Sequence, residues 1–467
     1  MKKISFLVLF VTLLTLGFSS CSSITGEDEL TGYIPGDAAM VMKLDCKKLF
    51  EASDVKVDGD KVELPSFMKK WFNNDEVETL SKLNNKLELD KVFMAINGEK
   101  DFIILVRTND FDGLCKMLEE DNDPVKKSQD DYTVYTSDNF TVAVYKQKYV
   151  FVKNSALTIA DFKTLVEKIK KNPLSKYPAL AQAVSTDDAI TFAMNYEQYM
   201  ALLPQFGTGA IVPASDYIKG KFMAGNINFV GNKALFDGEL GNIDGSPVKP
   251  VASMDDINIA LLSYVPEDYN IVFAAGKVTM TDNDYYDNLV KYSLPQLQGF
   301  VSMMRPYLES IDGSSMMAFR IDPALATLGF NPEYFDAILM IHMPMEKIRE
   351  AVSNLMTAAG MYGLPAAEIS RDMYAVTYGG ITIYFGASDG YLAISTQPVS
   401  ATHSPEFAKY FVNRKSAAVI DGSCLKGLLP FSPFAVMQSD GATEFKAEVT
   451  LEDTTDKFIP ALMQLAR

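Results

Sequence analysis

Few side chains in this sequence of 467 residues combine the types and spacing that catalysis requires. Histidine occurs twice, at His342 and His403, and neither lies in a motif such as G-x-S-x-G or H-E-x-x-H. No phosphate-binding glycine loop follows an expected strand, so nucleotide binding has no support in the sequence. His342 falls within an apolar strand pattern, and we expect it to be packed and hydrogen-bonded. We therefore assign no catalytic residue and no cofactor.

Acidic residues are frequent enough to raise the question of a metal site or a carboxylate hydrolase. Asp282, Asp284 and Asp287 alternate with other residues, and residues 119–123 form a second acidic run. Oxygen ligands at alternate positions suit Ca²⁺, but the glycine and the closing glutamate of an EF-hand are missing. We interpret both runs as solvated surface and assign no metal ligand. Among 60 acidic residues some facing pair is inevitable, so a hydrolase is only an alternative.

Cysteines and methionines offer two further possibilities. Cys46, Cys115 and Cys424 each fall in the first turn of an expected short helix, where the pKa of a thiol can be depressed. We favour the interpretation that they are small buried packing residues. Methionines gather in the second half, where they either fill a core, which is the commoner role, or line an adaptable apolar binding face. They are Met303, Met304, Met316, Met317, Met340, Met343 and Met345.

Cys21 is the residue with the most specific chemical assignment. Two lysines precede an apolar run at residues 4–16, and two serines lead into Cys21. A positive start, a short apolar segment and small residues before a cut site are typical of a secretory signal, and the run is too short to span a bilayer. Cleavage directly before a cysteine is typical of lipoproteins, whose thiol is acylated. We predict a signal peptide at residues 1–20 and a lipid anchor at Cys21.

Composition limits the partners of the remaining chain. The net charge at pH 7 is −17 and no basic cluster offsets it, which disfavours binding to nucleic acid. A hydrophobic share of 48% is typical of a globular protein with substantial cores. An acidic tether is expected at residues 21–32, and no later apolar run is long enough for a second membrane crossing. The membrane contact expected from the sequence is therefore the lipid anchor at Cys21.

The structural elements are expected to occur twice along the chain. Residues 33–41 (YIPGDAAMV) return at residues 264–272 (YVPEDYNIV), and both have a turn that leads into a strand. A strand–turn–strand pattern at residues 140–152 returns, in the same order, at residues 381–394. Matches that keep their order indicate a duplicated architecture.

We therefore predict an α+β fold of two tandem homologous halves, at residues 33–246 and 247–467. Each half is expected to be mostly antiparallel sheet, with short helices directly after strands. An Asp, Asn or Pro follows several apolar runs, and these residue types suit the start of a helix. They are Asp45, Asp110, Asn195, Pro344 and Asp421.

The lipid-attachment pattern, the acidic tether and the run Ile34-Pro35-Gly36-Asp37-Ala38 together resemble a family of Bacteroidetes outer-membrane lipoproteins of unknown function. The resemblance implies residence at the outer membrane, facing the periplasm or the cell surface, and carries over no site residue. We expect a non-enzymatic binding or scaffold module whose partner is an envelope protein or an extracellular ligand. The alternatives are a carboxylate hydrolase and a surface glycan- or lipid-binding accessory protein. An exposed row of Tyr or Met would favour the accessory protein.

Overall fold

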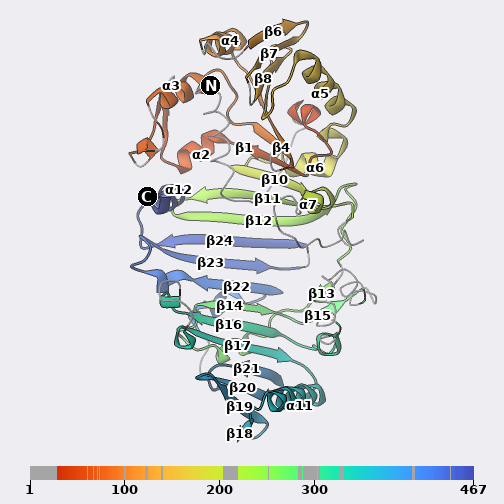
Figure 1. Ribbon diagram of the computed structural model, residues 1–467, viewed down its shortest axis with the longest axis vertical. Coiled ribbons are helices and arrows are strands. Elements are labelled where there is room, and N and C mark those ends of the chain that lie inside the picture. Colours follow the sequence, from red (N-terminus) through yellow and green to blue (C-terminus); the bar gives the residue numbers. More distant parts are fainter. Residues whose placement is uncertain are drawn as a thin grey trace. The chain divides into compact units, whose positions relative to one another are not determined.

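The chain forms two compact units that both combine helices with antiparallel sheet (Figure 1). Unit 1 consists of Met1–Val248 with Thr455–Arg467, and unit 2 consists of Lys249–Thr454. The mixture of helices and antiparallel strands agrees with the predicted α+β class. The structure is a computed structural model that describes residues 29–466 except 60, 67, 71, 73, 99–100, 121–124, 138–139, 203–218, 251, 282–286, 288–301, 303–304, 326–330, 402–404 and 442.

The described part of unit 1 contains an antiparallel sheet with the strand order β12–β11–β10–β1–β4–β5–β9–β8–β7–β6. Its strands are β1 (Met40–Leu44), β4 (Val92–Gly98), β5 (Asp101–Arg107), β6 (Val125–Gln129), β7 (Tyr132–Thr136), β8 (Thr141–Tyr145), β9 (Tyr149–Lys153), β10 (Ile190–Asn195), β11 (Lys221–Val230) and β12 (Lys233–Asn242). A separate hairpin consists of β2 (Lys56–Asp58) and β3 (Lys61–Glu63). The helices are η1 (Glu29–Tyr33), α2 (Cys46–Ala52), η2 (Met68–Lys70), α3 (Asn74–Asn84), α4 (Phe111–Glu119), α5 (Ile159–Lys171), η3 (Leu174–Lys176), α6 (Pro178–Ala183), α7 (Tyr196–Leu202), α12 (Phe458–Met463) and η9 (Gln464–Ala466).

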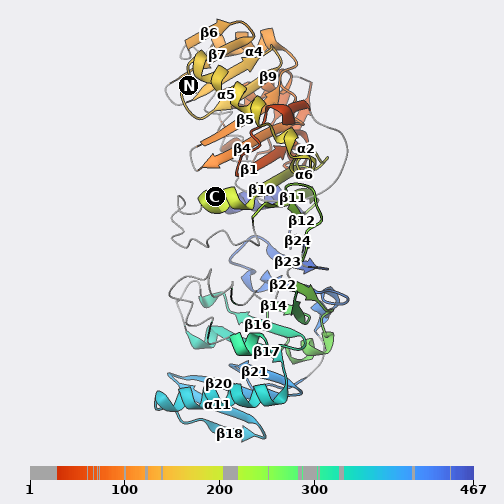
Figure 2. The same cartoon turned by 90° about the vertical axis from the view of Figure 1, so that its right-hand side faces the viewer.

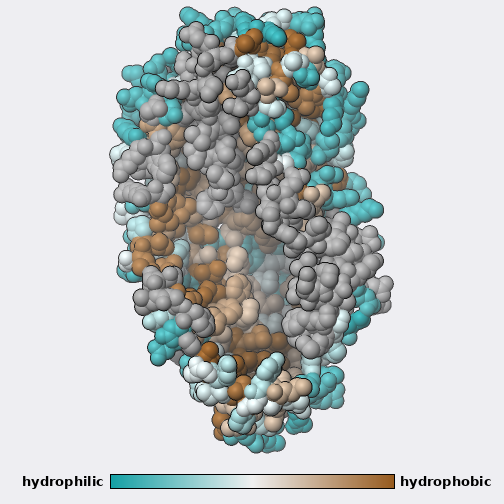
Figure 3. All heavy atoms as spheres, viewed as in Figure 1, coloured by the Kyte–Doolittle hydropathy of each residue, from teal (hydrophilic) through white to brown (hydrophobic). Residues whose placement is uncertain are grey.

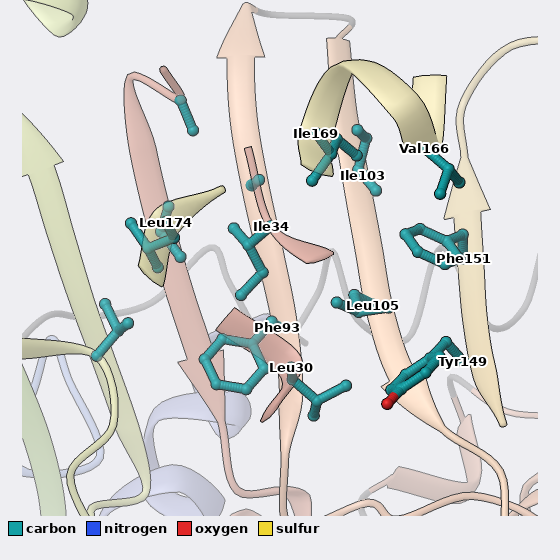
Figure 4. Packing of buried hydrophobic residues seen from close by; sticks show 14 of the residues in the cluster. Leu30, Ile34, Phe93, Ile103, Leu105, Tyr149, Phe151, Val166, Ile169 and Leu174 are labelled. Atoms are coloured by element: carbon teal, nitrogen blue, oxygen red, sulfur yellow. The ribbon is translucent and has the colours of Figure 1, made fainter. Parts of the chain in front are cut away.

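One face of the unit 1 sheet is covered by η1, α5, η3 and α6. Figure 4 shows Leu30 of η1, Val166 and Ile169 of α5 and Leu174 of η3 on the face of the sheet that carries Phe93 and Phe151. Helix α5 begins at a capping box, in which the Thr158 side chain accepts a hydrogen bond from the backbone N–H of Asp161 and the Asp161 side chain accepts one from the backbone N–H of Thr158. Its apolar residues recur at the spacing of one helix face, which places Phe162 and Val166 against the sheet.

The first described element, η1, corrects the predicted tether at residues 21–32 in its last four residues. Residues Glu29–Tyr33 form η1, and Leu30 is fully buried in the core of unit 1. The Glu29 carboxylate accepts hydrogen bonds from Tyr149 and Lys148, which holds the start of η1 on the sheet. The prediction was wrong for residues 29–32 because it followed the acidic residues and overlooked that Leu30 and Ile34 bury apolar surface together.

The described part of unit 2 contains an antiparallel sheet with the strand order β24–β23–β22–β14–β16–β17–β21–β20–β19–β18. Its strands are β14 (Ile271–Ala275), β16 (Ser315–Ile321), β17 (Phe335–His342), β18 (Ala367–Ser370), β19 (Met373–Tyr378), β20 (Ile381–Ser388), β21 (Tyr391–Ser395), β22 (Ser416–Asp421), β23 (Ser432–Ser439) and β24 (Glu444–Glu452). A second small sheet pairs β13 (Ala252–Met254) with β15 (Val278–Met280). The helices are η5 (Ile259–Tyr264), η6 (Pro332–Tyr334), α11 (Met345–Met361), η7 (Glu406–Tyr410) and η8 (Gly422–Leu425).

The two strand orders follow the same pattern of chain connections. Strand β14 has the place in unit 2 that β1 has in unit 1, and β20–β21 have the place of β8–β9. The repeated segments at residues 33–41 and 264–272 lead into β1 and β14, and those at residues 140–152 and 381–394 cover the β8–β9 and β20–β21 pairs. The repeated segments match Val41 with Val272, and the pairing registers within each sheet then give the strand residues of one unit their counterparts in the other.

The short helices after strands begin where the sequence predicts them. The side chains of Asp45 and Asp110 accept hydrogen bonds from the backbone N–H groups of Lys48 and Gly113, at 3.1 and 2.9 Å. Asn195 and Asp421 make the same contact at the starts of α7 and η8, and Pro344 precedes α11. These contacts satisfy N–H groups that have no partner within the helix.

The C-terminal segment Thr455–Arg467 groups with unit 1, although the sequence comparison placed it in the second half. The Phe458 ring is buried, its centroid lies 5.9 Å from that of Phe229, and its backbone N–H donates to the carbonyl of Gly231 at 2.9 Å. The sequence alone did not assign this segment, because its partners Phe229 and Gly231 lie far earlier in the chain.

Replacement of Phe458 by Ala should lower the free energy of unfolding by about 3–5 kcal/mol, because it empties a buried aromatic site. Denaturant unfolding of the full chain measures the loss. The control is Leu465→Ala, at an exposed position of the same segment, which should cost less than about 0.5 kcal/mol. Equal small effects of both substitutions would show that the segment is not part of the core of unit 1.

Candidate functional site

The second face of the unit 1 sheet is also buried. A row of side chains crosses the strands from Phe192 through Met42 and Met94 to Ile104, because these residues are aligned in register. Met42 and Met94 are each 4% exposed. Helix α4 packs on this face, where its Glu119 accepts a hydrogen bond from the hydroxyl of Tyr135 at 3.1 Å. We call the row formed by Phe192, Met42, Met94 and Ile104 the covered row.

The first face of the unit 2 sheet is buried in the same way. Met316 and Met340 belong to a core that also contains Leu261 and Leu262 of η5 and Phe411. Strand residues alternate between faces, so the neighbours of Met316 and Met340 along the strands point to the other side. The second face of unit 2 is therefore the one that can be compared with the covered row.

On that second face, an apolar row is only partly covered. Met317 of β16 lies between Phe273 of β14 and Leu339 of β17 in register, and Ala418 of β22 lies between Phe273 and Met437 of β23. Met317 is 41% exposed and Met437 is 39% exposed. Figure 3 shows hydrophobic side chains of unit 2 gathered in a hollow over these strands. We call these five residues the open row.

Helix α11 covers one end of this face. Its Ile348 and Val352 pack with Phe385 and Leu392, and Ile394 lies against the same cluster. Ile394 is aligned with Leu339, so the helix borders the open row directly. Figure 2 shows α11 alongside β20 in unit 2. Among the five described residues of the open row, Met317 and Met437 are exposed, Phe273 and Leu339 are half-buried, and the small Ala418 is buried.

Residue size differs at matched positions of the two rows. In unit 1, Gly225 stands beside Phe192, and a Cβ atom on Gly225 would come within 2.2 Å of the Phe192 ring. In unit 2 the corresponding pair is Met437 beside Ala418. In unit 1 the large side chain of the pair is Phe192 on β10, whereas in unit 2 it is Met437 on β23. The Met437 side chain is exposed, and methionine is more flexible than an aromatic ring.

The methionines of the second half divide between the two roles that the sequence left open. Met316, Met340 and Met343 are buried and fill cores. Met317 and Met345 are exposed on or beside the second face. Met303 and Met304 lie outside the described residues. The adjacent residues Met316 and Met317 thus have opposite roles, because successive strand residues point to opposite faces.

The interpretation of the cysteines as buried packing residues is confirmed for Cys46 and Cys115 and only in part for Cys424. Cys46 and Cys115 are buried, Cys424 is half-buried, and all three are free thiols. Burial raises the pKa of Cys46 to about 12, and it also raises the pKa values of Cys115 and Cys424. A raised pKa keeps these thiols protonated, which opposes nucleophilic or metal-binding chemistry.

His342 is hydrogen-bonded, as predicted, but it is not packed in a core. It ends β17, its side chain is partly exposed, and its Nδ1 lies 2.7 Å from Oδ1 of Asp312. Its ring meets that of Tyr391 edge to face, with centroids 5.1 Å apart. The strand pattern placed it correctly in sequence, but the last residue of a strand often leaves the core. His403 lies outside the described residues.

The buried carboxylates of Asp45 and Asp336 make structural contacts within the fold. Burial raises the pKa of Asp45, whose carboxylate caps α2. For Asp336, burial alone would raise the pKa, but hydrogen bonds from Gln397 and Arg320 outweigh it and hold the pKa below its usual value. No group of three or more His, Cys, Asp or Glu with metal-binding geometry occurs among the described residues.

Several predicted features lie wholly or partly outside the described residues. They include Cys21, the signal peptide, the residues from Cys21 to Asp28, Asp282, Asp284 and the last three residues of the acidic run at 119–123. Asp287 is described and forms an ion pair with Arg305, and Glu119 forms one with Lys126. Within the part of the chain that the structure describes, no helix has both the length and the hydropathy to cross a bilayer.

No family model matches the chain, and no curated protein matches it. Crystal form III of TP0453 is similar at 9% identity with a TM-score of 0.30, over 49% of this chain and 83% of that one. Crystal form IV of TP0453 is similar at 7% identity with a TM-score of 0.30, over 46% of this chain and 81% of that one.

The covered and open rows predict different costs for the same substitution at matched positions. Met94→Ala should lower the free energy of unfolding by about 2–4 kcal/mol, because it leaves a cavity in a closed core. Met317→Ala should cost less than about 1 kcal/mol, because solvent already reaches that side chain. Denaturant unfolding of both variants measures the difference. A cost for Met317→Ala as large as that for Met94→Ala would show that the open row is covered in solution.

Proposed function

We propose that this chain is a lipid-anchored protein of the cell envelope that binds an aliphatic ligand on the open row of unit 2. Cys21 is the lipid-modified residue, and the anchor holds the protein at the outer membrane. The protein acts by binding and does not catalyse a reaction. The observation that carries this proposal is the exposure of Met317 and Met437 at positions whose counterparts in unit 1 are buried or lack a side chain.

The lipid anchor is supported by the order of residues before Cys21. Two lysines, a short apolar run and two serines precede it, and this order is typical of a signal that is cut at a lipid-modified cysteine. Acyl chains gain about 0.8 kcal/mol per buried CH₂, so two or three of them hold a protein stably at a membrane. The sequence resemblance to Bacteroidetes outer-membrane lipoproteins points to the same membrane.

The nature of the ligand follows from the residues of the open row. Its five side chains are apolar, and none carries a hydrogen-bonding group. Neighbouring strands lie about 4.8 Å apart, so five strands give an apolar strip about 20 Å long, sufficient for an extended aliphatic chain. Methionine adapts its shape to different apolar partners. A glycan needs hydrogen-bonding partners, so the open row favours a lipid-like ligand over a sugar.

We also propose that the two units descend from one duplicated segment, as the two tandem homologous halves expected from the sequence. The matching strand order and the repeated segments at residues 33–41 and 264–272 support this origin. After a duplication, one copy can keep the original packing while residues of the other copy change. In this case unit 1 keeps a closed core, and the matched face of unit 2 becomes available for binding.

Protease treatment of intact cells tests the anchor and its location. The unmutated protein should fractionate with the outer membrane, and Cys21→Ala should appear in the soluble fraction, because the residue that carries the acyl chains is gone. Digestion of the body on intact cells indicates surface display, and protection until the outer membrane is opened indicates a periplasmic body. Membrane fractionation that is unchanged by Cys21→Ala would overturn the lipid anchor.

Displacement of an apolar fluorescent dye by saturated fatty acids tests the ligand site. Affinity should rise with chain length by up to about fourfold per methylene, because each added CH₂ is removed from water. Met317→Asp and Met437→Asp should each weaken binding at least about tenfold, because a carboxylate in the row must lose water when the ligand binds.

The matched control for these variants is Val57→Asp, at an exposed apolar position of the β2–β3 hairpin in unit 1. It should bind the fatty acids as the unmutated chain does. Thermal unfolding of each variant verifies that the body remains folded. Equal binding by the control and by both methionine variants would overturn the open row as the ligand site.

A further inference from the structure

Helix α11 and the β19–β20 hairpin contain two long runs without a charged residue. Residues 351–367 and 373–388 contain no Asp, Glu, Lys or Arg. At the overall charged share of 22%, the two runs together would carry about seven charged side chains. The runs also pack together, since Ala359 and Leu364 contact the cluster that contains Val376. We call the surface formed by these two runs the charge-free tip.

The charge-free tip exposes large apolar side chains. Met361 and Tyr362 are each 83% exposed, and Tyr378 is 72% exposed. Single exposed apolar residues are common, but a group of them marks an interaction site. Unit 1 has only scattered ones among its described residues, namely Val57, Val125, Val230 and Leu465. The concentration at the charge-free tip is therefore a property of unit 2.

The two exposed tyrosines of the charge-free tip, Tyr362 and Tyr378, lie at turns. Tyr362 directly follows the last residue of α11, and Tyr378 ends β19. The next two residues, Gly379 and Gly380, have φ values of +57° and +86°, which glycine adopts without strain. Tyrosine combines an apolar ring with a polar hydroxyl, so it suits the boundary between hydrocarbon and water.

We propose that the charge-free tip docks unit 2 onto the surface of a lipid bilayer. Charged side chains lose most from entering a medium of low dielectric constant, and the charge-free tip contains none. A surface for a protein partner normally has a polar rim and is enriched in Arg, whereas neither run contains an Arg. The exposed Arg371 between the runs precedes β19, at the opposite end of that strand from Tyr378. Contact with anionic headgroups needs Lys or Arg, so the attraction is apolar and does not depend on anionic lipid.

The position of α11 connects the charge-free tip with the open row. The helix packs against Ile394, and Ile394 is aligned with Leu339 of the open row. A bilayer that contacts the charge-free tip is therefore the source of the aliphatic ligand for the open row. This last step rests on the proposed function, whereas docking on the bilayer stands on the exposed residues of the charge-free tip alone.

Vesicle flotation tests the docking. The chain is used from residue 21 onward with Cys21→Ala, so that no acyl anchor contributes, and the vesicles are of zwitterionic phosphatidylcholine. The chain should float with the vesicles, and about 0.5 M salt should leave this unchanged, because the attraction is not electrostatic. Met361→Glu and Tyr362→Glu should each reduce the vesicle-bound fraction at least about tenfold, because a charge then has to enter the interface.

Val125→Glu is the matched control, since it places the same charge at an exposed apolar position of unit 1. It should float as the unmutated chain does. Failure of the unmutated chain to float, equal flotation of all variants, or binding that requires anionic lipid and disappears in salt would each overturn the docking. Dye displacement without vesicles distinguishes the two proposals. If flotation fails and fatty acids still displace dye from the open row, only the docking is wrong.

Discussion

The sheet of each unit carries apolar side chains on both faces, and this places one constraint on everything around it. Exposed apolar surface costs about 25 cal/mol per Å², so each face must be covered by other elements or remain available to a partner. In unit 1, η1, α5, η3 and α6 cover one face, and the residues of the covered row on the other face are buried too. In unit 2, η5 and neighbouring residues cover the first face, and α11 covers only part of the second.

The difference between the two units lies in a few residues and not in the strand order. Phe192 of the covered row lies beside Gly225 in unit 1, and Ala418 lies beside Met437 at the matched positions of unit 2. An aromatic ring that lies over a glycine is held in one position, whereas a methionine side chain can change its rotamer. The same strand order thus carries a buried apolar row in unit 1 and a partly exposed apolar row in unit 2. Unit 2 is also the unit that exposes the charge-free tip.

Sequence patterns predicted local features well and long-range features poorly. The helix starts after Asp45, Asp110 and Asp421 depend on hydrogen bonds to residues two or three positions ahead, so the sequence contains all that is needed. The burial of Leu30 and the packing of Phe458 in unit 1 depend on residues far away along the chain, and the sequence analysis predicted neither. The candidate site was predicted only in part. The sequence indicated that the methionines either fill a core or line a binding face, but it did not decide which methionine has which role.

The α+β class could be read from the sequence by itself, and so could the predictions of a lipid anchor at Cys21 and of repeated strand-forming segments, because all three depend on residue types at short spacing. Tertiary structure alone decided that Met316 is buried while its neighbour Met317 is exposed. Alternation places the two side chains on opposite faces of β16, but it does not say which face the rest of the chain covers. That choice depends on where η5 and α11 pack, and their packing partners are residues far apart in the sequence.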